Sequence, residues 1–387
     1  MNLLFNILII IIVILLFMLF KNKSILIAFV SSLLIVYIII SPKACINATL
    51  SGANLFFYKV FPSLFTFLIF TNVIISYNGV HIYSKIFGKI LCPPLKLDKK
   101  CSLPIVISAI CGYPLGAKYS CDLYENKDIT FESCERLINI ASNAGPLFII
   151  GSVGTSMLSN TYAGYTLLLS NYISCILMGI LLPRKRFKYR GFSKNTPYKI
   201  PNIGEVLKSS VDNSIKTCLN VGGFVILFSV LLSIIKNNLF FQLILNQLSS
   251  TFNLDKNLIE GFILGILEMT NGCYLISKSS VNLSLKIILI SFLLSFSGLS
   301  IISQVYSFTY KHNINMKRYI KLKFLQGILA SLVSIILYKI PLFNLTLNTF
   351  IENNNFLYYY NNILFILLLF LLIAPLIFFN VKRHNKY

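Results

Sequence analysis

Residues 112–118, GYPLGAK, interrupt the apolar run 102–118. Pro114 cannot donate a backbone hydrogen bond, and Gly112 and Gly116 allow another backbone to approach closely. Lipid cannot satisfy the backbone groups that such a break frees, so the break must be surrounded by protein or water. The stretch therefore predicts a half-helix within a membrane protein, with amide groups at its end that can face an anion.

The composition of the whole chain supports a membrane location. Of its 387 residues, 56% are hydrophobic and only 12% are charged, which is more apolar surface than a soluble core of this length can hide. Stretches such as 25–40 and 363–379 carry no charge and approach the roughly 20 residues that cross a bilayer. We expect an all-α polytopic membrane protein whose first partner is the lipid bilayer.

The excess of 34 Lys and Arg over 12 Asp and Glu does not indicate nucleic acid, because the basic residues cluster in short loops between apolar runs. The positive-inside rule explains them and places four basic segments in the cytoplasm, namely 85–100, 183–190, 311–323 and 382–386.

The polar stretch 191–209 divides the chain into two related halves. We expect N-terminal transmembrane helices over 1–53, a first repeat over 54–190, a cytoplasmic linker over 191–209, a second repeat over 210–345, and a C-terminal helix and basic tail over 346–387. Matching landmarks lie about 155 residues apart, with Gly112 opposite Glu268 and Pro146 opposite Gly298.

The halves have opposite orientations. The closing span of the first half ends on the basic loop at Arg184, whereas that of the second half begins at the basic segment ending at Lys323. This predicts an inverted-topology repeat with broken, re-entrant helices, and such repeats carry a transporter's binding site near the membrane midplane. Chance similarity between apolar sequences is the alternative.

Lys118 closes the first break, where a lysine beside freed amides offers an anion both charge and hydrogen bonds. A lysine that merely extends to the interface is the alternative. The second break, 142–146, offers uncharged polar groups that bind a polar ligand at a low desolvation cost. A plain kinked helix is the alternative there. The candidate ligand-binding residues of the first half are Gly112, Tyr113, Pro114, Gly116, Lys118, Ser142, Asn143, Gly145 and Pro146.

Glu268 is an ionisable residue within an apolar run of the second half, which makes it a candidate proton or cation carrier. A structural ion pair or an interfacial position is the alternative. Small polar residues complete the second-half candidates, although such residues also simply pack membrane helices together. The second-half candidates are Glu268, Thr270, Asn271, Ser297 and Gly298.

The sequence contains no metalloprotease, nucleophile-elbow or Walker motif, and its nine cysteines include no CxxC pair. We therefore expect no catalytic residue, no metal site, no cofactor and no enzyme activity. Without a Walker motif, any transport is expected to be secondary.

The motifs 112–118, 135–137 (ERL) and 143–149 (NAGPLFI) resemble those of the YlbJ (SpoVV) family of sporulation integral membrane proteins, within the wider Gate group of nucleoside-recognition membrane domains. The resemblance spans about 54–345, and the second half matches only in pattern. It implies passage of dipicolinic acid from the mother cell across the outer forespore membrane, with channel proteins on the forespore side as candidate partners. Tyr113 or Phe148 would stack on the ring of this aromatic dianion, or simply pack.

Two other functions remain open. The wider group implies a transporter of nucleosides or another small polar metabolite, which would not need Lys118. A non-transporting sporulation scaffold is the second, although the longest polar stretch, about 187–209, is short for a docking segment. The sequence leaves the substrate, the direction, the ion coupling and the oligomeric state open.

Overall fold

The fold is described from a computed structural model that covers residues 23–182 and 201–339. Every regular element in these two ranges is helical, as the apolar periodicity predicts. The first 22 residues of the expected N-terminal region 1–53, the C-terminal segment 346–387 and the basic run 183–190 lie outside the described residues.

The N-terminal part consists of a bent helix pair and a long helical path. Helix α2 (Lys23–Ile40) meets α3 (Pro42–Leu55) at an angle of 104°, because Pro42 cannot donate the hydrogen bond that would continue α2. A π-helical turn, η1 (Phe56–Val60), joins α3 to α4 (Phe61–Ser76) without a gap. The predicted boundary at 53/54 therefore lies inside one helical path, because nothing in the sequence there ends a helix.

The first half continues through short helices to two broken spans. After a 90° bend come α5 (Gly79–Ile86), α6 (Gly88–Leu91) and the 3₁₀ turn η2 (Lys99–Cys101). The first broken span is α7 (Ser102–Cys111) followed by α8 (Leu115–Glu125). The second is α9 (Phe131–Ile140) followed by the π-helix η3 (Leu147–Met157), and α10 (Thr161–Leu181) closes the half.

The second half repeats this order of elements. It opens with α11 (Ile203–Lys236) and α12 (Leu239–Phe252), and its first broken span is α13 (Lys256–Leu267) followed by α14 (Met269–Lys278). Its second broken span is α15 (Leu283–Phe296) followed by α16 (Gly298–Thr309), and α17 (Met316–Lys339) closes it. The order of breaks that the sequence predicts is therefore present in both halves.

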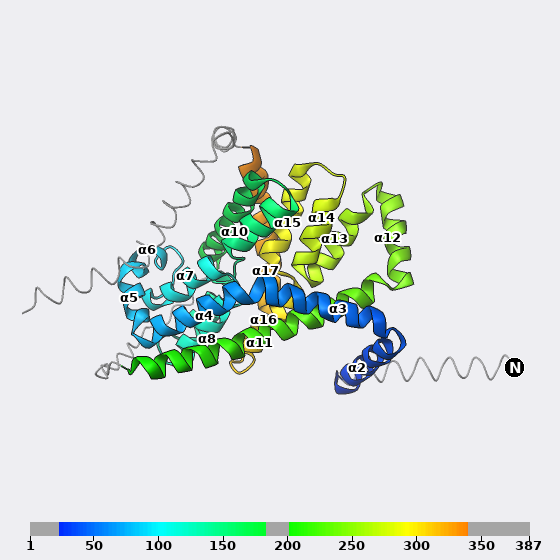
Figure 1. Cartoon of the computed structure of the whole chain (residues 1–387). Helices are drawn as coiled ribbons and strands as arrows, with labels where there is room; N and C mark the ends of the chain where they lie inside the picture. The colour runs from blue at the N-terminus through cyan, green and yellow to red at the C-terminus, as the bar shows by residue number, and fades with distance from the viewer. Residues whose placement is uncertain (1–22, 183–200, 340–387) are drawn as a thin grey trace, which may run out of the picture.

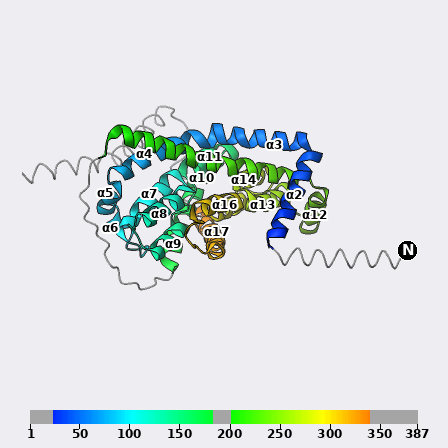
Figure 2. The same ribbon diagram turned by 90° about the horizontal axis from the view of Figure 1, so that it is seen from below.

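Helix α11 corrects the predicted linker. It is 34 residues long and begins at Ile203, where the side chain of Asn202 accepts a hydrogen bond from the Gly204 amide. The last residues of the expected linker 191–209 are thus helical, because an Asn cap and apolar residues at Ile203, Val206 and Leu207 outweigh the local polarity. Figures 1 and 2 show α11 running alongside α3 and α4, which it contacts along much of its length.

The segments that the sequence predicts to be broken are pairs of short helices, among them the apolar run 102–118. Within the described residues, α10, α11, α15 with α16, and α17 are long and apolar enough to cross a membrane, and counting each of the two bent N-terminal pairs as one span brings the number to six. The chain is thus a multi-pass, all-α membrane protein.

The two halves pack against each other through their closing helices. Figure 1 shows α10, α15 and α17 at the centre, with α7 and α8 on one side and α13 and α14 on the other. Ser170 and Ser291 share a hydrogen bond of 3.1 Å, and the Asn171 amide donates to Ser295 over 3.1 Å. Such small polar contacts hold membrane helices together where the hydrophobic effect cannot.

Candidate functional site

The two breaks of the first half cross each other at Gly112 and Gly145. Gly112 has φ +85°, and a Cβ on it would lie 2.6 Å from the Gly145 nitrogen. The amide of Tyr113 donates to the Asn143 carbonyl over 2.7 Å, and the Asn143 amide donates to the Ser108 hydroxyl over 3.3 Å. The first-half candidates predicted from separate motifs therefore meet at one point, which we call the first crossing (Gly112, Tyr113, Asn143, Gly145).

A second close approach lies one turn further along α8. A Cβ on Gly116 would lie 1.9 Å from the Ala141 carbonyl oxygen, so only glycine fits there. Pro114 immediately precedes α8, and Pro146 immediately precedes η3. Both prolines thus stand at helix starts, where the missing donor is tolerated.

The breaks of the second half cross in the same way. Gly298 has φ +71°, and a Cβ on it would lie 3.2 Å from both the Gly265 carbonyl oxygen and the Met269 nitrogen. Ser297, with φ 71°, ends α15 in the left-handed conformation. We call this point the second crossing (Gly265, Met269, Ser297, Gly298).

Glu268 caps the helix that starts at the second crossing. Its carboxylate accepts hydrogen bonds from the amides of Thr270 and Asn271, each over 2.9 Å, and from the Asn271 side chain over 2.8 Å. A carboxylate at a helix N-terminus is favoured by both the free amides and the helix dipole. The three predicted residues are therefore together, and the positive end of α14 already carries a negative group of the protein itself.

One side-chain contact joins the two crossings. The Tyr113 hydroxyl donates a hydrogen bond to the sulfur of Met269. Tyr113 belongs to the break between α7 and α8, and Met269 is the first residue of α14. The matching breaks of the two halves thus meet, as expected for a repeat-based site.

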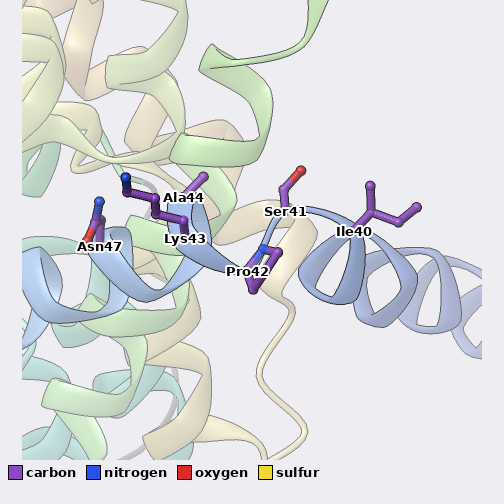
Figure 3. A pocket seen from close by; sticks show the side chains of 6 residues that line it. All are labelled: Ile40, Ser41, Pro42, Lys43, Ala44 and Asn47. Atoms are coloured by element: carbon purple, nitrogen blue, oxygen red, sulfur yellow. The ribbon is translucent and has the colours of Figure 1, made fainter.

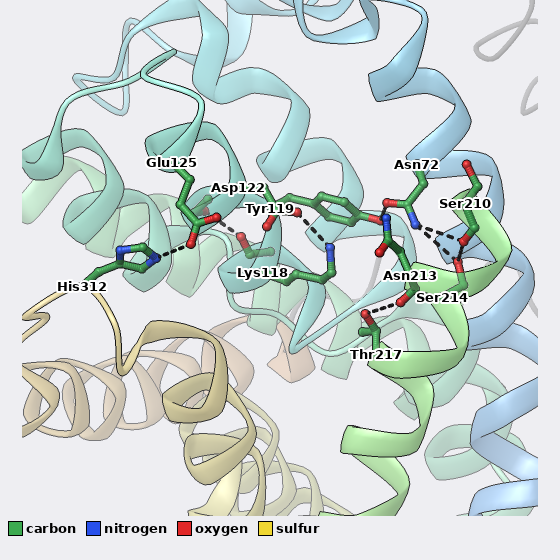
Figure 4. A network of polar contacts seen from close by, with 12 residues as sticks. Asn72, Lys118, Tyr119, Asp122, Glu125, Ser210, Asn213, Ser214, Thr217 and His312 are labelled. Carbon is green, nitrogen blue, oxygen red and sulfur yellow. Dashed lines mark hydrogen bonds and ion pairs between the residues drawn. The ribbon is translucent and has the colours of Figure 1, made fainter. Parts of the chain in front are cut away.

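Lys118 lies apart from this junction. Its ammonium group is 2.8 Å from the Asp122 carboxylate and 4.5 Å from the centre of the Tyr119 ring. Figure 4 shows it in a polar network with α4 and α11, in which the Tyr119 hydroxyl donates to Asn72 over 3.2 Å and Asn72 donates to Ser214 over 3.3 Å. The charge predicted to meet an anion is therefore already paired within α8.

The buried cation at the first crossing is Lys323, which the sequence analysis places at the end of a basic cytoplasmic loop. The structure corrects this position: Lys323 lies in α17 and is 0% exposed. Its ammonium group donates to the Ser142 carbonyl over 2.9 Å and to the Gln326 side-chain oxygen over 2.9 Å. Gln326 could have indicated from the sequence that Lys323 is buried, because it is a second polar residue one helical turn after Lys323 within the same apolar run.

Ser142 makes a further contact across the halves. Its hydroxyl shares a hydrogen bond of 2.9 Å with the Tyr319 hydroxyl, which is also on α17. Ser142 follows the end of α9, where the chain leaves the helix before Pro146. Backbone carbonyls of such unwound segments are strong acceptors because no helical donor reaches them.

A shallow pocket lies at the bend between α2 and α3, outside this region. Figure 3 shows its lining residues, which are Ile40, Ser41, Pro42, Lys43, Ala44 and Asn47. None of the candidate residues lines it. The candidate site therefore lies where the first and second crossings meet, together with Tyr319 and Lys323 of α17, which contact Ser142.

Two further ionisable residues lie in helices outside the candidate site. Glu260, in α13, is 6% exposed and lies 3.3 Å from the Lys236 ammonium group. His81 is in α5. Within the described residues, no three His, Cys, Asp or Glu side chains gather into a group that would hold a metal ion.

Comparisons with known proteins support the resemblance seen in the sequence. No family model matches the chain. The sporulation integral membrane protein YlbJ of Bacillus subtilis is 28% identical over 346 residues, which cover 84% of each chain. The solved structure of a doubly substituted CNTnw in an outward-facing state is 16% identical and covers 73% of this chain and 75% of its own, with a TM-score of 0.44.

Proposed function

Starting from its relationship to the sporulation integral membrane protein YlbJ, we propose that this chain is a sporulation membrane transporter for dipicolinate, a small aromatic dicarboxylate. The observation that carries the proposal is the contact of Tyr113 with Met269, which joins the broken helices of the two halves. In secondary transporters, broken helices at a repeat interface form the substrate site. The proposal includes no catalytic step and no cofactor.

The proposed route runs from the mother cell across the outer forespore membrane, with channel proteins on the forespore side as candidate partners. In the mechanism we propose, one repeat rocks against the other around the crossings. The contact between Tyr113 and Met269 then opens on one side, while the hydrogen bonds of α10 to α15 hold the two halves together.

The first crossing offers groups that suit a flat aromatic dianion. Helix α8 begins at Leu115, so the amides of Leu115 and Gly116 point out of its positive end. The half-buried rings of Tyr113 and Phe148 flank the two breaks and present aromatic faces. Carboxylates bind such amide groups through charge-assisted hydrogen bonds.

Uptake of labelled dipicolinate into proteoliposomes that hold the purified full-length chain tests the proposal. We expect saturable uptake that excess unlabelled dipicolinate blocks and that uridine leaves unchanged. Liposomes without protein provide the background.

Two results contradict the proposal. Uptake that uridine blocks would assign the site to nucleosides, for which the uncharged groups of Asn143 and Asn271 provide hydrogen bonds. Absence of uptake for dipicolinate, uridine and their close analogues would favour the non-transporting scaffold.

A further inference from the structure

Lys323 is a buried lysine with no carboxylate partner within the part of the chain that the structure describes. It is 0% exposed and forms no ion pair with the carboxylates of residues 23–182 and 201–339. Its two acceptors, the Ser142 carbonyl and the Gln326 amide oxygen, are neutral. An ammonium ion removed from water is costly unless an opposite charge compensates it, and a buried ionisable group within a membrane segment is a functional candidate.

Several hydrogen-bond donors around Lys323 are left over among the described residues, and one neighbouring acceptor, the buried Asn143 Oδ1, is also unpaired. An ammonium group has three N–H bonds, and two of those of Lys323 have acceptors in the structure. The Gln326 side-chain nitrogen is buried and has no acceptor among the described residues. The hydroxyls of Ser142 and Tyr319 share one hydrogen bond, so one of their two hydrogens is not used in it.

These donors come from both halves of the chain and adjoin the first crossing. Tyr319, Lys323 and Gln326 share one face of α17, whereas Ser142 belongs to the unwound segment after α9. The next residue, Asn143, accepts the hydrogen bond of the Tyr113 amide. The cluster therefore lies within one residue of the backbone break that the proposed function assigns to the substrate.

We propose that Lys323, Gln326 and the hydroxyl pair of Ser142 and Tyr319 form the subsite that binds a carboxylate of the transported molecule. This inference rests on the proposed function and deepens it, because it names the positive charge that selects an anion. A carboxylate has only acceptors, so it complements the surplus donors and neutralises the ammonium group. The same subsite discriminates against a neutral amide, whose N–H bonds would face the donors of Lys323 and Gln326.

Calorimetric titration of the full-length protein in lipid nanodiscs tests the subsite. The probes are pyridine-2,6-dicarboxylate, its monoamide and its diamide, and chloride serves as a small inorganic anion. We expect the wild type to bind the dicarboxylate at least about tenfold more tightly than the diamide, as one charge-assisted contact provides. We expect Lys323→Met to lose most of this preference and Lys323→Arg, which keeps the charge, to retain part of it.

Lys286→Met is the matched control. The Lys286 ammonium group, on α15, also donates to a backbone carbonyl, that of Ser277, over 2.9 Å. It lies outside the cluster, so its loss should leave the preference for the dicarboxylate unchanged. Should Lys323→Met fail to give a monodisperse protein, Gln326→Leu serves as the second variant. It removes both the unpaired donor of Gln326 and the oxygen that accepts from Lys323, and it should lower the ratio of the dicarboxylate affinity to the diamide affinity.

The outcomes separate the subsite from the function on which it rests. A wild type that does not bind the dicarboxylate contradicts the proposed function itself. A wild type that prefers the dicarboxylate, with the same preference in Lys323→Met, overturns the subsite and leaves Lys323 as a cation at the end of α9. Chloride that displaces the dicarboxylate at equal concentration would also overturn it, because a general anion site has no carboxylate selectivity.

Discussion

The Tyr113 hydroxyl and the Met269 sulfur form a hydrogen bond between residues 156 positions apart, at the corresponding breaks of the two halves. Each half thus contributes one group to the same contact. In the rocking motion proposed above, this contact opens while the hydrogen bonds of α10 to α15 persist.

Tyr113→Phe removes this hydrogen bond and keeps the ring. We expect a loss of stability of no more than about 1 kcal/mol, since a single neutral hydrogen bond contributes about that much. The rate of dipicolinate uptake should change more than the thermal midpoint, because the contact lies between the moving parts. Tyr274→Phe, at an exposed position of α14, is the control and should change neither. Equal uptake rates in Tyr113→Phe and the wild type would contradict a role for this contact in the transport cycle.

Gly112→Ala should destabilise the protein. Its φ of +85° disfavours any side chain, and the new Cβ would lie 2.6 Å from the Gly145 nitrogen. We expect a cost of roughly 1–3 kcal/mol from the backbone conformation alone. Gly223→Ala on α11 is the control, because nothing lies within 4 Å of its Cβ position and alanine favours a helix. Thermal unfolding of both variants checks this, and an unchanged midpoint in Gly112→Ala would show that the two breaks do not cross so closely.

Glu268→Gln tests whether this residue carries protons. We expect the variant to change the pH dependence of uptake, measured as the initial rate from pH 5 to 8. Glu268→Ala should also cost about 1 kcal/mol, because it removes the cap of α14. Asp255→Asn, at the cap of the neighbouring α13, is the control for a capping effect alone. A Glu268→Gln variant with the wild-type pH profile would limit Glu268 to capping.

Asp255 predicts a pH dependence of stability outside the membrane-spanning segments. Hydrogen bonds from Ser280, whose amide and hydroxyl each donate over 2.6 Å, lower the pKa of Asp255 below its ordinary value. A carboxyl whose pKa is lower in the folded state contributes stability above its unfolded pKa of about 3.9 and loses it as the pH falls through the folded pKa. The wild type should therefore exceed Asp255→Asn in thermal midpoint at pH 7 and approach it near pH 3. A difference that is the same at both pH values would contradict the assignment.

The two candidate lysines, Lys118 and Lys323, should differ in their effect on uptake. Lys118 is already paired with Asp122, whereas Lys323 has no carboxylate partner among the described residues. We expect Lys323→Met to lower the initial rate of dipicolinate uptake more than Lys118→Met does. The opposite order would return the anion-binding role to Lys118, as the sequence alone predicts.

The sequence predicts the breaks well because glycine and proline act locally. Gly112, Pro114, Gly145, Pro146 and Gly298 all stand where a helix stops or starts. The prediction that the breaks lie close together rests on the inverted repeat alone. No local sequence pattern specifies which pairs of breaks are in contact. The structure supplies that information through the contacts of Gly112 with Gly145 and of Gly298 with Gly265.

The positions of charged residues were harder to predict. Lys323 follows several basic residues, so local composition indicates a loop, although α17 begins at Met316 and buries it. The ion pair of Lys118 with Asp122 could be predicted from the i, i+4 spacing of the two residues, provided that α8 is known to extend to Glu125. The apolar run ends at Lys118, whereas α8 continues through polar residues to Glu125, so hydropathy alone does not predict where this helix ends.

Helix α11 is longer than the hydrocarbon core of a bilayer is thick. Its 34 residues correspond to a length of about 51 Å, whereas the hydrocarbon core is about 30 Å thick. Its last 18 residues are almost free of charge, but its first half carries Glu205, Lys208, Asp212 and Lys216. A helix that keeps these four charges out of the hydrocarbon projects its first turns into the water layer. We therefore expect the start of α11 to lie in the water layer outside the headgroups, where water-soluble reagents that do not enter the membrane can reach it.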